Sequence, residues 1–123
     1  AQGQKMKLFA GSEGFRRDFI YVDDIVQMNL HFYQTKTSGI FNAGTGKARS
    51  FQDIATTLQQ LELVGQIEII PFPDHLEGKY QEFTEADTTL LRKAGYERPM
   101  TSLEYGVRQY YDLWKRTGGY RRD

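Results

Sequence analysis

The segment that most limits the fold is a short apolar run that enters a glycine turn and is followed by a helix. Residues Ile40 to Ala43 are nearly all apolar, and Gly44-Thr45-Gly46 follows them. We predict a strand over 40–43, because such a run is typical of a strand covered on both faces in a parallel sheet. Ser50 then caps a helix that runs to about Leu63, with Asp53 completing an approximate capping box. Strand, glycine turn and helix in this order indicate an α/β fold.

The rest of the chain alternates between short strands and helices in the same way. Strands are expected where β-branched and aromatic residues gather, and helices where apolar residues recur every three or four positions. The expected strands are 7–9, 18–22 and 66–70, with an extended piece over 80–84 and a turn over 11–14; the other expected helices run from Asp23 or Asp24 to about Tyr33, from Asp87 to Ala94, and from Thr101 or Ser102 to about Arg116. Four or so short strands are too few for a self-sufficient doubly wound sheet. We therefore interpret the chain as the C-terminal portion of a larger α/β protein.

Length and charge narrow the classes of protein further. The chain has 123 residues, enough for one domain, and we expect 1–117 to be folded and 118–123 to be a flexible tail. Its 16 basic and 16 acidic residues cancel, which argues against a general affinity for nucleic acid or anionic membranes. The absence of cysteine excludes disulfides and thiolate metal sites and favours a cytoplasmic location.

A candidate anion site lies in the run from Phe9 to Asp24. Gly11-Ser12-Glu13-Gly14 forms a turn whose glycines let the backbone approach a ligand closely. Arg17 follows and offers a planar fork of donors to a phosphate, with an ordinary ion pair as the alternative. The hydroxyl of Tyr80, after a proline-rich loop, is either a second phosphate donor or the tip of a partly buried ring.

Three other patterns do not carry chemistry. Gly44-Thr45-Gly46 fails as a dinucleotide fingerprint because Arg49 stands where the third glycine belongs, and as a phosphate-binding loop because Ala48 replaces Ser or Thr. His31 and His75 lack the spacing of metal ligands, so no metal site is expected. Adjacent Asp23 and Asp24 do not face one another on a helix, which favours a capping role over a pair of catalytic carboxylates.

Several motifs resemble the C-terminal part of extended short-chain dehydrogenase/reductases that act on nucleotide sugars. These are Arg17-Asp18-Phe19-Ile20-Tyr21-Val22-Asp23-Asp24, Phe41-Asn42-Ala43-Gly44-Thr45-Gly46 with Ser50-Phe51, and Ala94-Gly95-Tyr96 with Pro99. Two further stretches are similar to the ADP-glyceromanno-heptose 6-epimerase family: Phe9-Ala10-Gly11-Ser12, and Ile69 to Asp74 leading on to Asp87. The resemblance covers nearly the whole chain. It implies the substrate-binding part of a Rossmann-type α/β fold, with short strands and three to four helices.

The resemblance also implies an activity for the complete enzyme. Enzymes of this family invert C6 of the heptose in an ADP-sugar, for the inner core of lipopolysaccharide, by removing and returning a hydride with bound NADP. Their Rossmann domain, cofactor fingerprint and catalytic Tyr and Lys lie in the N-terminal portion, which no residues here match. By resemblance, this chain holds no catalytic and no cofactor-binding residue and is inactive alone.

The same resemblance assigns site residues and partners. The substrate-binding residues it implies are Phe9, Ala10, Gly11, Ser12, Arg17 and Tyr80, with Ala10 standing where the family often has Glu. The implied partners are ADP-heptose, the Rossmann portion of the same chain and further copies in a homo-oligomer, which in this family tends to be a pentamer. Two alternatives remain open: another nucleotide-sugar epimerase or dehydratase, and a free-standing nucleotide- or RNA-binding module built on Phe15-Arg16-Arg17 and Phe19.

Overall fold

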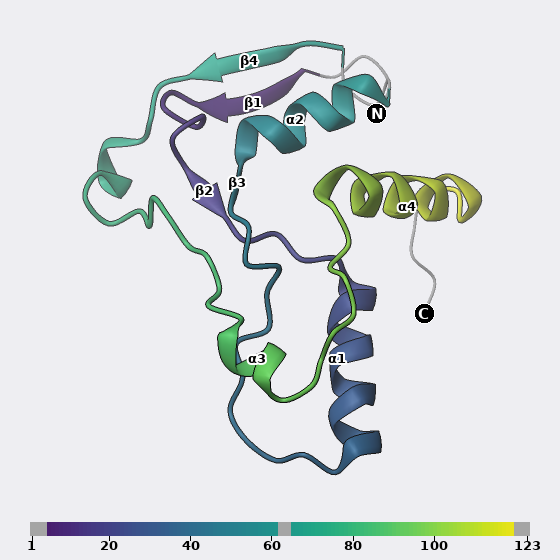
Figure 1. The fold of residues 1–123 in the computed structure, drawn as a ribbon. Coiled ribbons are helices and arrows are strands. Elements are labelled where there is room, and N and C mark those ends of the chain that lie inside the picture. The colour runs from purple at the N-terminus through teal and green to yellow at the C-terminus, as the bar shows by residue number, and fades with distance from the viewer. Residues whose placement is uncertain (1–4, 62–64, 120–123) are drawn as a thin grey trace.

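The computed structural model describes residues 5–61 and 65–119, which form two lobes joined by extended segments (Figure 1). The first lobe holds all the strands with two helices, and the second holds the remaining α-helices. In chain order the elements are β1 (Met6–Phe9), β2 (Arg16–Arg17), α1 (Val22–Thr35), β3 (Arg49–Ser50), α2 (Phe51–Gln60), β4 (Ile67–Ile70), a 3-10 helix (Asp74–Leu76), α3 (Thr89–Lys93) and α4 (Leu103–Arg116). None of the helices described is long and apolar enough to span a membrane.

Two small sheets organise the first lobe. β1 runs parallel to β4, with Met6 opposite Ile67 and Phe9 opposite Ile70. β2 pairs antiparallel with β3, and α2 lies beside both β1 and α4 (Figure 1). Arg16 also bonds to the later chain, since its N–H donates to the Glu82 carbonyl at 2.8 Å and its own carbonyl accepts from Thr84 N–H at 3.0 Å. The expected extended piece over 80–84 is thereby held against β2.

The capping box at the start of α2 is confirmed. Ser50 Oγ accepts from the Asp53 N–H and Asp53 Oδ2 accepts from the Ser50 N–H, both at 3.0 Å. Arg49 extends the cap by pairing with Asp53 and with Glu104 of α4. The start of α2 is therefore tied both to its own first turn and to the neighbouring helix.

The Ser50→Ala variant is expected to lower the free energy of unfolding of the complete protein by about 1 kcal/mol, the usual value of a side-chain N-cap. Ser38→Ala, at an exposed position outside the helices, is the control and is expected to change stability by less than about 0.5 kcal/mol. Urea titration measures both variants. Equal midpoints for Ser50→Ala and the unaltered protein would show that the cap contributes nothing.

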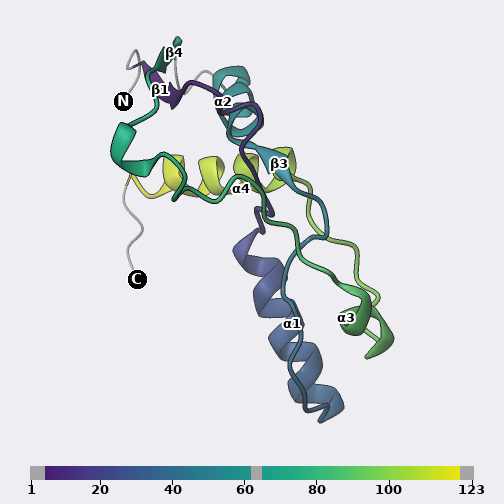
Figure 2. The ribbon, with the colours of Figure 1, turned by 90° about the vertical axis from the view of Figure 1, so that its left-hand side faces the viewer.

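The core of the second lobe lies between α1 and the chain around α3. Met28, Leu91 and Tyr96 are buried there, and Ile20, Ile25, Phe32, Phe41 and Met100 pack against them. Met28 is on α1 and Leu91 on α3, two helices that lie side by side in both views (Figures 1 and 2). Lys36 adopts a left-handed conformation with φ 53° and ends α1, as the sequence around Gly39 suggests.

Two predicted strands are wrong. No strand forms over 18–22, because Asp18 binds other loops and the chain then passes directly into α1; the strand of this region is Arg16–Arg17, just before the expected range. Residues 40–43 form no strand, and Ile40 is 94% exposed. A strand exists only with a neighbour to pair with, and no described residue pairs with this segment.

The capping role predicted for the first acidic residues of α1 is also wrong. Tyr21 is the N-cap residue of α1, with no side-chain cap. Asp24 is instead buried and accepts hydrogen bonds from the N–H of Thr101 at 2.8 Å and from its Oγ1 at 2.7 Å. The Asp24 carboxylate therefore binds a segment 77 positions further along the sequence and does not cap its own helix. The helix expected over 87–94 is shorter, at Thr89–Lys93. The predicted end of the second helix at Leu63 and residues 120–123 of the tail expected over 118–123 lie outside the described residues.

Candidate functional site

Arg17 is held between aromatic rings. Its Cζ lies 5.1 Å from the centre of the Tyr80 ring and 5.9 Å from the centre of the Phe51 ring. Its Nη1 donates to the carbonyl of Arg16 at 3.0 Å. Within residues 5–61 and 65–119, the ion pairs are those of Arg49, and Arg17 has none. The positive charge is therefore fixed in place by stacking and remains available to an anion.

An aromatic cluster brings two distant parts of the candidate site together. The Phe15 ring lies 5.1 Å from the Tyr80 ring and 5.5 Å from the Phe72 ring, measured between centres. Phe9, at the end of β1, packs edge-on against Phe72 at 5.5 Å. Phe9, Arg17 and Tyr80 therefore belong to one continuous set of contacts, although they are far apart in the sequence.

The glycine turn after β1 forms as predicted and buries a hydroxyl that has no partner. The turn is closed by bonds from Ser12 N–H to the Phe9 carbonyl at 3.0 Å and from Gly14 N–H to the Gly11 carbonyl at 2.9 Å. Gly11 has φ +84°, which a side chain would strain. Ser12 is 2% exposed and its Oγ has no hydrogen-bond partner. A buried hydroxyl normally has a partner, so this one is an exception. Ala10 next to it is exposed, and its N–H donates to the Ile70 carbonyl at 2.8 Å.

Asp18, directly after Arg17, is the site residue that the sequence analysis missed. Its carboxylate accepts from the N–H and the hydroxyl of Thr45, from Gly46 N–H at 2.9 Å and from Ala86 N–H at 3.1 Å. Burial raises the pKa of Asp18, but these four donors outweigh it and hold the pKa below the ordinary 3.8. A side chain at Gly44 would come within 2.7 Å of the Asp18 carboxylate. The Gly44-Thr45-Gly46 turn, which fits no phosphate fingerprint, therefore serves to receive Asp18.

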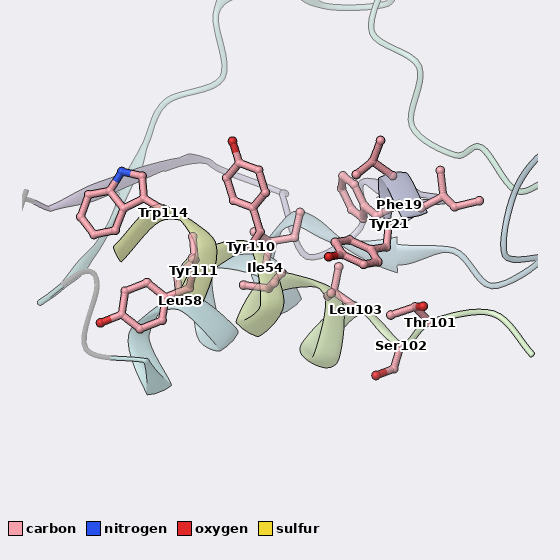
Figure 3. Close-up of a pocket in the computed structure, with 14 residues that line it drawn as sticks. Phe19, Tyr21, Ile54, Leu58, Thr101, Ser102, Leu103, Tyr110, Tyr111 and Trp114 are labelled. Atoms are coloured by element: carbon pink, nitrogen blue, oxygen red, sulfur yellow. The ribbon is translucent and has the colours of Figure 1, made fainter. Parts of the chain in front are cut away.

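An apolar cavity lies elsewhere, between α2, α4 and the start of α1 (Figure 3). It has a volume of about 570 Å³ and is lined by apolar and hydroxyl-bearing side chains, among them Phe19, Tyr21, Leu58, Tyr110, Tyr111 and Trp114. The side of α4 that lines it carries Leu103, Val107, Tyr110, Tyr111 and Trp114. No charged side chain lines it, and neither do the six predicted site residues. The cavity is thus unsuited to a diphosphate.

The amino-acid sequence of this chain is similar to that of a known protein. No family model matches the chain. Over 119 residues, 96% of the chain, it is 48% identical to a curated protein of Brachyspira hyodysenteriae named ADP-L-glycero-D-manno-heptose-6-epimerase. The chain is related to the C-terminal part of a heptose epimerase. It covers 37% of that relative, so it spans little more than a third of the length of the heptose epimerase it matches.

Solved structures share the fold of this chain. The crystal structure of the Helicobacter pylori ADP-L-glycero-D-manno-heptose-6-epimerase superposes with a TM-score of 0.74 and 27% identity, over 89% of this chain and 32% of that one. TunA, described as an NAD-dependent NDP-hexosamine 5,6-dehydratase of tunicamycin biosynthesis, superposes with a TM-score of 0.72 and 24% identity, over 97% of this chain and 36% of TunA. The second likeness concerns the fold alone. The expected fold is confirmed: it is the C-terminal part of the extended short-chain dehydrogenase/reductase fold.

Proposed function

We propose that this chain is the substrate-binding, C-terminal part of an NADP-dependent epimerase that interconverts ADP-D-glycero- and ADP-L-glycero-D-manno-heptose at C6. The observation that carries the proposal is the 48% identity to a heptose epimerase over 96% of the chain. Arg17 supports it, because its cation is stacked on Tyr80 and has no ion-pair partner among the described residues.

The proposed contacts follow from the chemistry of the side chains. Arg17 donates two N–H groups to the diphosphate, and Tyr80, on which it stacks, donates its hydroxyl. Ser12 Oγ bonds to the sugar or to a phosphate oxygen, which gives the buried hydroxyl its partner. Gly11, Ala10 and Phe9 line the ligand, with Ala10 contributing no side-chain polar group where relatives often carry Glu.

NADP and the catalytic Tyr and Lys are proposed for the portion of the enzyme that precedes this sequence. The cofactor supplies the hydride chemistry when bound. The residues of this chain hold the ADP end of the substrate, so that the sugar carbon is oriented toward that chemistry. Remote contacts of this kind contribute several kcal/mol to catalysis through orientation. We further propose that the complete enzyme is a cytoplasmic homo-oligomer that feeds lipopolysaccharide synthesis.

A second candidate is another enzyme of nucleotide sugars. TunA matches this chain with a TM-score of 0.72, almost as high as the 0.74 of the heptose epimerase, and TunA acts on a nucleotide-linked hexosamine. One fold therefore carries different sugars, and the choice among them rests on the sequence relationship.

The test uses the complete protein that contains this sequence. We expect it to convert ADP-D-glycero-D-manno-heptose into the L-glycero epimer. The proton NMR signal of the hydrogen on C6 measures this conversion. ADP-sugars should compete for the site more strongly than UDP- or GDP-sugars. Turnover of a UDP- or GDP-sugar, with no inversion at C6 of ADP-heptose, would replace this proposal with the second candidate.

Tyr80 offers a finer test, because the ring and the hydroxyl are separable. In Tyr80→Phe the ring still stacks on Phe15 and Arg17, so we expect the KM for ADP-heptose to rise about ten-fold, the lower end of the range for one lost hydrogen bond to a charged group. Tyr105→Phe, at a ring that is 56% exposed on α4, is the control and should leave KM unchanged. An unchanged KM in Tyr80→Phe would limit Tyr80 to stacking.

A further inference from the structure

The guanidinium of Arg17 has a second aromatic neighbour besides Tyr80. The Arg17 Cζ lies over the Phe51 ring at 5.9 Å from its centre, and at 5.1 Å from the centre of the Tyr80 ring. Tyr80 belongs to a segment outside the helices and strands, whereas Phe51 is the first residue of α2. The two rings therefore hold the same cation from different parts of the fold.

The backbone of Phe51 is fixed relative to the strand that carries Arg17. β3 pairs with β2 so that Arg49 lies opposite Arg17, and Phe51 follows β3 directly. The N–H of Phe51 donates to the carbonyl of Phe15, just before β2, at 3.4 Å. The capping box at the start of α2 fixes the first turn of the helix itself. Hydrogen bonds of the first lobe thus set the place from which the Phe51 ring extends.

The Phe51 ring is also supported by a second ring. Phe19 packs edge-on against it, with 5.5 Å between the ring centres and an interplanar angle of 77°. Edge-on packing of this kind favours one orientation of the two rings. Phe19 therefore restricts the Phe51 ring, and the Phe51 ring in turn restricts Arg17.

A restricted guanidinium is better prepared to bind a phosphate. A free arginine side chain has many rotamers, and binding an anion through two N–H groups selects few of them. A guanidinium that is already held by rings loses less freedom when the anion binds. The hydrogen bond from Arg17 Nη1 to the Arg16 carbonyl at 3.0 Å restricts the same group further. The cation is thus ordered before any ligand is present.

We propose that Phe51 is a positioning residue of the diphosphate site: its ring holds the Arg17 guanidinium in the orientation that binds phosphate, and it acts on the ligand only through Arg17. This inference rests on the proposed function, which assigns the diphosphate to Arg17. The alternative is a purely structural role, in which the Phe51 ring serves only to pack against Phe19.

A double-mutant cycle in the complete protein tests the inference. Phe51→Leu keeps an apolar side chain but removes the ring. We expect it to raise the KM for ADP-heptose about five-fold, which corresponds to about 1 kcal/mol, an ordinary value for a cation–π contact. It should leave kcat within about two-fold, because the residue does not act on the reacting carbon. When Arg17→Ala is already present, Phe51→Leu should change KM by less than about two-fold.

Phe32→Leu is the matched control. Phe32 is half-buried like Phe51 and stacks on Phe41 at 4.5 Å in the second lobe, so the variant loses a comparable ring contact without affecting Arg17. We expect it to be less stable in urea but to have an unchanged KM. Phe51→Met repeats the test if Phe51→Leu does not fold. An unchanged KM in the Phe51 variant, or a rise of equal size with and without Arg17, would overturn the inference.

Titration of the NADP-saturated protein with ADP separates this inference from the proposed function, because ADP carries the diphosphate without the heptose. We expect Phe51→Leu to weaken ADP binding about five-fold, and only while Arg17 is present. If ADP binding follows this pattern in a protein that does not invert C6 of ADP-heptose, the positioning role stands and the proposed function fails. If an active epimerase binds ADP equally well with and without the Phe51 ring, the proposed function stands and the positioning role fails.

Discussion

Arg17→Ala in the complete protein is expected to raise the KM for ADP-heptose about 100-fold, which corresponds to about 2.7 kcal/mol of lost binding. The guanidinium of Arg17 lies between the Tyr80 and Phe51 rings and has no ion-pair partner among the described residues, so a diphosphate would be its principal anion. Bidentate, charge-assisted hydrogen bonds to phosphate are among the strongest that a side chain makes. Binding of NADP should change by less than two-fold, because no cofactor contact is proposed for this chain.

Steady-state kinetics with ADP-heptose and fluorescence titration with NADPH measure the two ligands separately. Arg16→Ala is the matched control, since Arg16 is exposed and precedes Arg17 on the same strand. It should leave both affinities within two-fold of the unaltered protein. Arg17→Lys retains the charge but not the planar fork, so an intermediate rise in KM is expected. Equal losses of ADP-heptose and NADP affinity in Arg17→Ala would remove the diphosphate role.

Local signals in the sequence were enough to predict several elements. Ser50 and Asp53 start α2 through a capping box, and Ser102 caps α4 by accepting from the Tyr105 N–H at 3.2 Å. These predictions held because the interacting atoms lie within three residues of each other. The turn at Gly11 formed as predicted for the same reason, whereas the binding role of Arg17 stays a prediction. Their meeting with Tyr80 through an aromatic cluster is a fact of the folded chain, and the sequence alone carries no signal for it.

The failed predictions depend on partners that sequence patterns do not reveal. Asp24 has the residue type and the position that favour a helix cap. Its carboxylate instead accepts two hydrogen bonds from Thr101, which is 77 positions further along the sequence. Residues 40–43 have a strand composition without a strand to pair with. Both errors arise because propensity describes one segment, whereas pairing is a property of two. Asp18 belongs with them, and its role becomes visible only when the Gly44 turn and Ala86 are placed around it.

Asp18→Ala is expected to lower the free energy of unfolding by about 2 to 4 kcal/mol, because it leaves three backbone N–H groups and a hydroxyl without their acceptor. The carboxylate joins the end of β2 to the Gly44-Thr45-Gly46 turn and to Ala86, so its loss loosens the chain directly after Arg17. We therefore expect the KM for ADP-heptose to rise as well, even at temperatures where the variant is folded. Urea denaturation and kinetics on the same preparation measure the two effects.

Acidity provides a test specific to the carboxylate. The pKa of Asp18 in the folded protein lies below 3.8, so its contribution is fully present above the unfolded pKa of about 3.9 and is lost as pH falls through the folded value. The difference in stability between the unaltered protein and Asp18→Ala should thus be constant near neutrality and shrink below about pH 4. Asp23→Ala, at an exposed aspartate on α1, is the control and should lower stability far less than Asp18→Ala near neutrality. If Asp18→Ala were as stable as Asp23→Ala, water would have replaced the carboxylate as the acceptor of the four hydrogen bonds. The glycine turn itself would then hold the junction.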